Sequence, residues 1–441
     1  MQKSLYISHS KRGSTLYYLD ASARYRCIFP CDQKEDGHLK HCIHIDQITL
    51  IDLTQYQTII FHRPSMSWKL KALLIKLKRL NIKAVVDFDD LLFVPQYALQ
   101  NPTYLSGNMS ASYAKSATKN YLKALKLFDF VQTSTEPLTV QVKAIHPNCS
   151  IETRYNKLPQ SWVKLTPQLP AEERFKNKVI RYFPGTSHHT TNLKPAIETL
   201  KLILNTNKDI KLEIIGDIHI PEETFPKSQF KKLPYVTYEE LPKSIANSWI
   251  TISPLEVNEF SQCKSALKFW ESACFGVPVI SNKIPDMQRL ECSALLLSDN
   301  HEDWLTYINQ LKNLDNYIKV SESAYKKSKD CIYVNDSCNK HNYSKIHLLM
   351  SAKFGPTWPA IRYNPTHHQH NSCLELLQKI NIVENTNDIT QKTIEQLTAE
   401  ATILSDELFS LDYKNKKYKK LLKLKNNPKL FFTDMIKNMK R

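Results

Sequence analysis

The chain has 441 residues, of which 42% are hydrophobic, and its formal net charge is +17. This length allows two domains with full hydrophobic cores, and the composition is that of a soluble globular protein. No run of about 18 apolar residues occurs and the N-terminus lacks the apolar core of a signal peptide, so we expect a cytosolic chain that is neither exported nor membrane-spanning. The ten cysteines follow no disulfide-scaffold spacing and are expected to be reduced thiols.

The first 155 residues alternate short β-branched segments with longer segments of helical periodicity. Strands are predicted at 4–8, 57–61, 83–88, 128–134 and 150–155, and helices at 67–80 and 111–128. This alternation is typical of βαβ units around a parallel sheet, so residues 1–160 are predicted to form a Rossmann-like domain.

The stretch between the first two predicted strands is interpreted as irregular and surface-like. It contains six potential zinc ligands: Cys27, Cys31, His38, His41, Cys42 and His44. Their spacing fits no usual ligand template, so we predict no metal site there.

Residues 157–177 contain three prolines among polar residues and are predicted to be a linker. A second alternation follows, which predicts another Rossmann-like domain at 175–335. Its strands are expected at 179–183, 210–216, 249–254, 277–281 and 294–298, and its helices at 193–205, 238–248, 264–275 and 302–314. No GxGxxG follows the first strand of the chain, which counts against a dehydrogenase.

The most informative segment is residues 254–282, which predicts a strand, a loop, a helix, a turn and a second strand. Four polar residues recur at helical spacing and are expected on one helix face, the first two at its start: Lys264, Ser265, Lys268 and Glu271. Lysines near a helix N-terminus attract a diphosphate, and a carboxylate accepts hydrogen bonds from sugar or ribose hydroxyls. The pattern favours a nucleotide-sugar ligand; the alternative is an ordinary amphipathic helix with solvated charges.

Within this segment, KSALKFWESACFGVPVI resembles the KSxxKxxExxxxGxPVI signature of GT-B glycosyltransferases similar to family 4. The resemblance implies an α/β fold with two Rossmann-like doubly wound domains facing a cleft, the second of which binds the donor. It assigns donor binding to nine residues: Gly185, Thr186, His188, Asn258, Phe260, Lys264, Ser265, Lys268 and Glu271. Many family members carry another glutamate eight residues before the first. Here that position is Cys263, which leaves the sugar and the stereochemical outcome open.

Residues 182–193, YFPGTSHHTTNL, resemble the YxSGTxxH loop of the same family. Gly185 allows close approach of a backbone, and the side chains of Thr186, Ser187 and His188 are expected to donate to donor phosphates. The alternative is a purely structural turn. Because the loop follows a strand, its position at the strand's carboxyl end favours ligand binding.

Residues 85–93, VVDFDDLLF, also resemble a family segment and place three aspartates at a strand end. With arginines near the first two strand ends, they are interpreted as acceptor-binding: Arg24, Arg26, Arg63, Asp87, Asp89 and Asp90. Two alternatives stay open, capping of the next turn by an aspartate and pairing of the arginines with carboxylates such as Asp87. A GT-A-like metal site is disfavoured because a second donor-like half follows, so neither metal nor cofactor is predicted. In 133–138, Ser134 or Thr135 is expected to cap the next helix.

Residues 336–412 are predicted to be irregular and then helical, with His367, His368 and His370 in a solvated loop. The tail at 413–441 carries eleven Lys or Arg and one acid, interleaved with Leu, Phe and Met. Such a basic amphipathic pattern attracts anionic lipid headgroups and inserts apolar side chains at the interface. Nucleic-acid binding and packing of a helix on the body are the alternatives.

These features together predict a metal-independent GT-B glycosyltransferase. It is expected to move a sugar from a nucleotide-sugar donor to a bacterial surface glycan, of capsule or lipopolysaccharide, or to its lipid-linked precursor. The expected location is cytoplasmic, at the inner face of the cell membrane, with the tail on anionic lipid and no nucleic-acid partner. The alternatives are an inactive donor-binding scaffold of a polysaccharide assembly complex and a basic nucleic-acid-binding protein.

Overall fold

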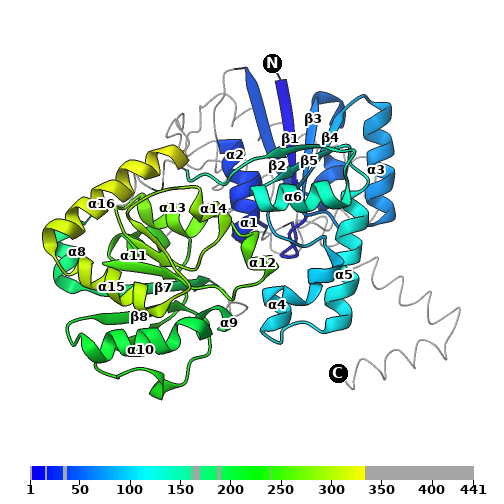
Figure 1. Ribbon diagram of the computed structural model, residues 1–441. Coiled ribbons are helices and arrows are strands. Elements are labelled where there is room, and N and C mark those ends of the chain that lie inside the picture. The colour runs from blue at the N-terminus through cyan, green and yellow to red at the C-terminus, as the bar shows by residue number, and fades with distance from the viewer. Residues whose placement is uncertain are drawn as a thin grey trace, which may run out of the picture. The chain divides into compact units, whose positions relative to one another are not determined.

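Figure 1 shows the computed structural model, which describes residues 2–14, 17–32, 37–159, 162, 169–185, 190–238 and 240–332. Residues 2–9, 21–42 and 54–332 belong to one compact unit, which holds two six-stranded sheets. Residues 10–20 and 43–53 belong to a second unit. The predicted extension at 336–412, its histidines and the basic tail at 413–441 lie outside the described residues.

The first sheet has the strand order β2-β1-β3-β4-β5-β6. Its strands are β1 (Gln2–Ser8), β2 (His38–His44), β3 (Thr58–His62), β4 (Lys83–Phe88), β5 (Phe130–Thr133) and β6 (Ser150–Thr153). Neighbours from β1 through β6 pair in parallel. Central residues such as Ile59, Ile60 and Val86 are buried, as expected for strands with helices on both faces.

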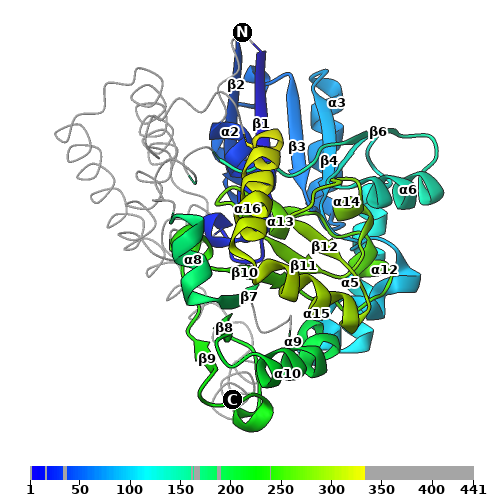
Figure 2. The ribbon, with the colours of Figure 1, turned by 60° about the vertical axis from the view of Figure 1, so that its left-hand side comes forward.

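Three longer helices accompany this sheet, and Figure 2 shows α3 and α6 beside it. They are α3 (Trp68–Arg79), α5 (Ala111–Leu125) and α6 (Glu136–Ile145). The hydroxyls of Ser67, Ser110 and Thr135 cap their N-termini by accepting a backbone N–H, which confirms Thr135 as one of the two expected caps. Shorter elements are α1 (Ala21–Ala23), the π-helical turn η2 (Arg24–Ile28), α2 (Phe29–Asp32), η5 (Pro95–Gln100) and α4 (Pro102–Leu105).

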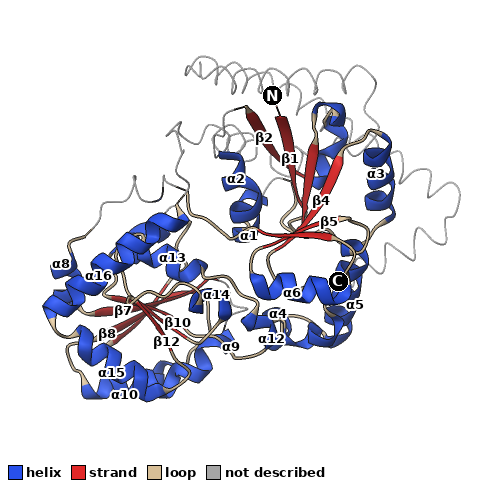
Figure 3. Cartoon of the chain, turned by 45° about the horizontal axis from the view of Figure 1, so that its top comes forward, coloured by secondary structure: helices blue, strands red, loops and turns tan. Residues whose placement is uncertain are grey.

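The second sheet has the order β12-β11-β10-β7-β8-β9, also with parallel pairs. Its strands, red in Figure 3, are β7 (Val179–Gly185), β8 (Lys211–Gly216), β9 (Phe230–Leu233), β10 (Ile250–Ser253), β11 (Val279–Ser281) and β12 (Leu295–Leu297). The helices are α8 (Ala171–Asn177), α9 (Thr190–Leu193), α10 (Ile197–Thr206), α11 (Leu241–Ala246), α12 (Glu259–Gln262), α13 (Leu267–Ala273), α14 (Pro285–Gln288), α15 (His301–Leu311) and α16 (Leu314–Ser328).

Several elements differ from the sequence expectations. Helix α8 lies within the stretch at 157–177 that was predicted to be a linker. The stretch interpreted as irregular contains strand β2, whose HLKHCIH sequence is poor in the β-branched residues that signal a strand. Strand β9 has only four residues, FKKL, and was not predicted either. Helix α16 follows α15 after a two-residue turn; it buries Tyr317, Val320 and Ala324 at helical spacing, but its buried serines weaken the apolar pattern.

The core of the second sheet includes two aromatic residues from far earlier in the chain, Tyr25 and Phe29. Their rings lie 6.4 Å and 5.7 Å from the ring of Tyr238, and the guanidinium of Arg24 lies 4.2 Å from the same ring. The turn η2 and helix α2 therefore pack against the half of the molecule that carries the KSxxKxxE segment. Among the described residues, no helix is long and apolar enough to cross a bilayer.

Candidate functional site

Residues 259–273, which include the KSxxKxxE motif at 264–271, fold as two short helices joined by a turn. Asn258 caps α12 through a capping box with Ser261. Lys264 and Ser265 lie in the turn, and α13 begins only at Leu267. The expectation of one helix beginning at Lys264 is therefore wrong.

The turn is held by a contact from a later segment of the chain. The backbone N–H of Ala266, the residue that precedes α13, donates to the Asp286 carboxylate at 2.6 Å. Burial raises the pKa of Asp286, and its bonds to Arg289 oppose that rise. Since this N–H already has a carboxylate partner, the lysine side chains are the groups of this segment best placed to meet a phosphate.

Glu271 is the central carboxylate of the segment. It is 4% exposed, and both of its oxygens have partners. The Tyr25 hydroxyl donates to Oε1 at 2.8 Å, and the Lys268 ammonium donates to Oε2 at 3.1 Å from one turn earlier on α13. Burial, with the Glu271 charge next, holds the pKa of Tyr25 well above its usual value, so the phenol stays a hydrogen-bond donor. Tyr25 thus fixes the orientation of Glu271.

A chain of charged side chains begins at Lys264. Its ammonium lies 2.8 Å from Asp90 Oδ1, and Arg63 bridges Asp90 and Asp89 with separate guanidinium nitrogens. His62 Nε2 lies 3.1 Å from Asp89 Oδ1. Arg63 has a left-handed backbone, with φ of 50°, which costs free energy in a residue with a side chain. Such strain is common where a side chain must be held in one place.

The charge states of this cluster follow from its pairing. Burial alone would lower the pKa of His62, but the Asp89 carboxylate and the Cys27 side chain together outweigh burial and raise it to about 10. Burial alone would likewise raise the pKa of Asp89, but Arg63 and His62 hold it well below its usual value. His62 and Asp89 are therefore both charged at neutral pH.

The raised pKa of His62 predicts a pH-dependent contribution to stability. Because the folded pKa exceeds the unfolded value of 6.5, this contribution is fully present below pH 6.5 and is lost as the pH rises through about 10. We expect His62→Gln to lower the free energy of unfolding at pH 6.5, and the deficit to shrink toward pH 10. Urea unfolding of both proteins across this range checks it; an equal deficit at both ends contradicts it.

Arg26 and Asp87 form a more deeply buried pair. Both side chains are at most 3% exposed, and Arg26 Nε donates to Asp87 Oδ2 at 2.9 Å. Arg26 also donates to the carbonyl of Arg154 and to Asn156 Oδ1. Burial would lower the pKa of Arg26, but Asp87 reverses this effect and raises it. The pairing of an arginine with Asp87, which the sequence left open as an alternative, is therefore present. Arg26 links Asp87 on β4 to Arg154 and Asn156 in the segment that follows β6.

Residues 258–265 also make direct contacts with residues of the half of the molecule that carries the first sheet. Thr135 Oγ1 donates to the Cys263 carbonyl at 3.0 Å, and Asn156 Nδ2 donates to Ser265 Oγ at 3.1 Å. The Phe260 N–H donates to Gln100 Oε1 at 3.2 Å. Several of the predicted donor-side and acceptor-side residues are therefore brought together, with Lys264 and Asp90 in direct contact.

Cys263 stands where the resembling family often has a glutamate. Its side chain is buried, and burial, with nearby Glu259 and Asp90 next, raises the thiol pKa to about 12. It is a neutral thiol at neutral pH and supplies no carboxylate.

Gly185 ends β7 with φ of 80°, and, its chain neighbours aside, no atom of the described residues lies within 4 Å of where a Cβ would be. The position thus needs glycine for its backbone and leaves open space beside it. Thr186, Ser187 and His188 of the predicted phosphate loop lie outside the described residues.

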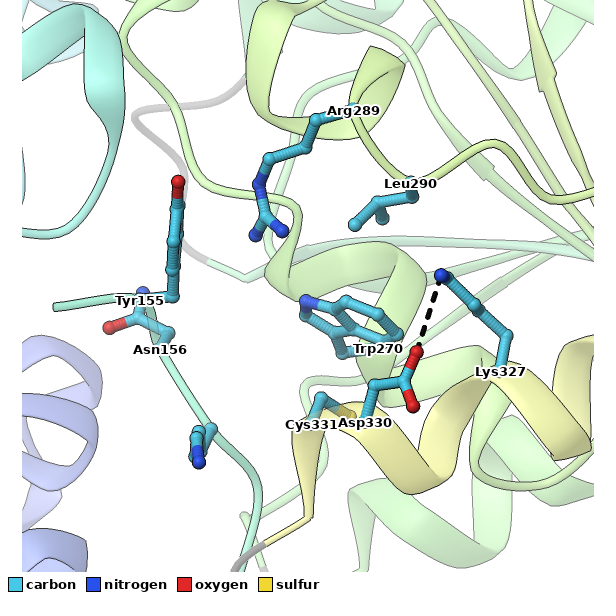
Figure 4. A pocket seen from close by; sticks show the side chains of 9 residues that line it. Tyr155, Asn156, Trp270, Arg289, Leu290, Lys327, Asp330 and Cys331 are labelled. Atoms are coloured by element: carbon cyan, nitrogen blue, oxygen red, sulfur yellow. Dashed lines mark ion pairs between the residues drawn. The ribbon is translucent and has the colours of Figure 1, made fainter. Parts of the chain in front are cut away.

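A hollow of about 140 Å³ borders α13 on the side of Trp270, as Figure 4 shows. Its lining includes Tyr155, Arg289 and Cys331, and the Arg289 guanidinium carbon lies 3.8 Å from the Tyr155 ring centroid. Tyr155 belongs to the segment that follows β6, so this segment packs near the helix that carries Glu271.

Sequence reasoning missed Tyr25, Asn156 and Asp286 as partners of the predicted site. Tyr25 lies between Arg24 and Arg26, and only the charges of these two arginines had suggested a binding role. Asn156 and Asp286 belong to no motif. A tyrosine 246 positions from its carboxylate partner leaves no local signal in one sequence.

No protein-family model and no curated protein sequence matches this chain. Among solved structures, it is similar to Anabaena HepE in complex with UDP and glucose, with a TM-score of 0.51 and 13% identity; the match covers 80% of this chain and 100% of HepE. It is also similar to an alpha-glucosyltransferase in complex with UDP-glucose and DNA containing an abasic site, with a TM-score of 0.50 and 12% identity, covering 79% and 99% of the two chains. At such identities the likeness concerns the fold. With its two six-stranded Rossmann-like sheets, this chain has the GT-B fold.

Proposed function

We propose that this chain is a glycosyltransferase that moves a sugar from a nucleotide-sugar donor, with a UDP-sugar as the expected donor. The observation that carries this proposal is the pairing of buried Glu271 with Lys268 on α13, with Lys264 in the turn that precedes this helix, in a segment next to a parallel sheet. Two cations and one oriented carboxylate match a ligand with a diphosphate at one end and hydroxyls at the other. The two similar structures support the choice of nucleotide, since each holds UDP or UDP-glucose.

In the proposed reaction, the bond between the sugar C1 and the diphosphate oxygen breaks and a bond to the oxygen of an acceptor hydroxyl forms, while the hydroxyl proton passes to the released diphosphate or to solvent. Lys264 and Lys268 stabilise the negative charge that develops on the leaving diphosphate, so no metal is required. Glu271 accepts hydrogen bonds from donor hydroxyls. The open space beside Gly185 admits the phosphates, with Thr186 and His188 as further expected donors. We assign Asn258 and Phe260 a supporting role, because Asn258 caps α12 and the Lys264 ammonium lies 4.9 Å from the centroid of the Phe260 ring.

The acceptor is proposed to be a bacterial surface glycan or its lipid-linked precursor. Arg63, Asp89 and Asp90 are the proposed acceptor contacts, because their side chains are 8 to 22% exposed and Asp90 pairs with Lys264. Arg24, Arg26 and Asp87 are more buried and act on the acceptor only by shaping this surface. The basic tail is proposed to hold the enzyme on anionic lipid at the inner face of the cell membrane.

A donor panel tests the proposal. We expect a UDP-sugar to raise the thermal unfolding temperature of the full chain, because a ligand that binds only the folded state stabilises it by mass action. The panel compares UDP-, GDP-, CMP- and ADP-linked sugars. Lys268→Gln should lose the shift. Lys201→Gln should keep it, since Lys201 forms the same kind of i,i+3 pair with exposed Glu198 at 2.8 Å.

The outcomes separate the alternative functions. A shift accompanied by release of nucleotide when acceptor glycan is added supports the enzyme. A shift without transfer to any acceptor or to water supports a donor-binding scaffold, for which buried Cys263 is the favouring observation. No shift with any donor at millimolar concentration contradicts both, and salt-sensitive binding to DNA would then support the nucleic-acid alternative.

A further inference from the structure

Helix α3 has apolar residues on both of its faces. Leu70 and Leu77 are buried, 3% and 0% exposed. On the opposite side, Trp68 is 75% exposed and Ile75 is 55% exposed, and their separation of seven residues places them in line two turns apart. Packing against the sheet explains why Leu70 and Leu77 are apolar, but it does not explain the exposed Trp68 and Ile75.

Lysines flank this exposed pair on both sides. At 100° per residue, Lys71 and Lys78 fall on one side of the line from Trp68 to Ile75, and Lys69 and Lys76 fall on the other. With Arg79 the helix has five cations and no acid in its twelve residues. An apolar stripe between two rows of lysines is the pattern of a helix that lies in a bilayer interface.

The neighbouring helix extends the basic surface. The Met66 N–H donates to the Asn120 carbonyl at 3.2 Å, which places the start of α3 beside α5. Helix α3 connects β3 to β4, and α5 connects β4 to β5, so both connections move across the sheet in the same direction. Because such connections between parallel strands are right-handed, the two helices cover the same face of the sheet. Figure 1 shows them on one side of this sheet. Helix α5 adds three exposed lysines and no acid: Lys115, Lys119 and Lys123.

We propose that the outer surface of α3 and α5 docks on an anionic lipid bilayer, with Trp68 and Ile75 at the boundary between headgroups and acyl chains. The lysines meet lipid phosphates, and charge complementarity selects an anionic membrane. DNA would satisfy the lysines, but a phosphate backbone gains nothing from an exposed Ile75 in the middle of the helix face. The surface is independent of Glu271 and of the tail, so it stands whether or not the donor site is correct.

Tryptophan fluorescence of the full chain tests this contact locally. Among the described residues, Trp162, Trp249, Trp270 and Trp304 are all at most 5% exposed, whereas Trp68 is exposed. We expect vesicles of phosphatidylglycerol and phosphatidylcholine with brominated acyl chains to quench the wild type. Trp68→Phe removes this quenched component and leaves the signal of every other tryptophan in place. Equal quenching of both proteins overturns the proposal.

Vesicle affinity gives a second test. We expect the double variant Trp68→Ser with Ile75→Ser to bind phosphatidylglycerol vesicles about tenfold more weakly, because two inserting side chains are lost. Both are exposed, so the fold should tolerate the change. Tyr235→Ser is the matched control, because Tyr235 is 58% exposed in the half with the second sheet. Unchanged vesicle affinity of the double variant overturns the proposal, as does binding to duplex DNA with none to vesicles.

Discussion

Glu271→Gln should lower kcat/KM for a UDP-sugar about ten- to hundredfold while leaving the fold intact. A hydrogen bond to a charged group is worth about 1.5 to 3 kcal/mol, and the neutral amide accepts donor hydroxyls more weakly than the carboxylate. The amide has nearly the same shape and keeps an oxygen for the Tyr25 hydroxyl, now 2.8 Å from Oε1. The measurement is initial-rate kinetics of nucleotide release, with thermal unfolding as the check on folding.

Two further variants sharpen this result. Tyr25→Phe should lower kcat/KM only about three- to tenfold, mainly through the donor KM, because it removes one hydrogen bond that orients Glu271. Glu198→Gln should have no effect, because Glu198 belongs to an exposed pair on α10. Turnover by Glu271→Gln at the wild-type rate would remove the proposed role of this carboxylate in transfer.

Arg26→Met should destabilise the protein by about 3 to 5 kcal/mol. Removing one member of a buried ion pair leaves the other as an uncompensated buried charge, and Asp87 is 1% exposed. The substitution also removes the bonds to the Arg154 carbonyl and to Asn156. Urea unfolding at neutral pH measures the loss as a lower midpoint with an unchanged slope.

The double variant Arg26→Met with Asp87→Leu is the informative comparison. With both charges gone the desolvation cost also disappears, so we expect it to recover much of the stability lost in the single variant. Lys201→Met, at a pair whose side chains are 38% and 77% exposed, should change stability by less than about 1 kcal/mol. A single variant at Arg26 as stable as this control would contradict the buried-pair account.

The sequence predicted the local structure correctly around Lys268 and Glu271 but not around Lys264. Lys268 and Glu271 were expected on one helix face, and they are one turn apart and paired on α13. Lys264 was expected on the same helix, but it lies in a turn because Asp286, from a later segment, binds the backbone N–H of Ala266. Helical spacing alone carries no information about such a partner 20 positions away.

The sequence by itself determined the two βαβ halves, because buried parallel strands must be continuous apolar runs and the helices between them must be periodic. It also located the polar residues at strand ends, since chain order dictates which residues follow each strand. The tertiary structure alone decided their partners: Tyr25 on Glu271, Asp90 on Lys264 and Asp87 on Arg26. These contacts join segments 61 to 246 residues apart. The first two pairings depend on how the two folded halves meet and the third on how η2 packs against β4, and no local propensity encodes either geometry.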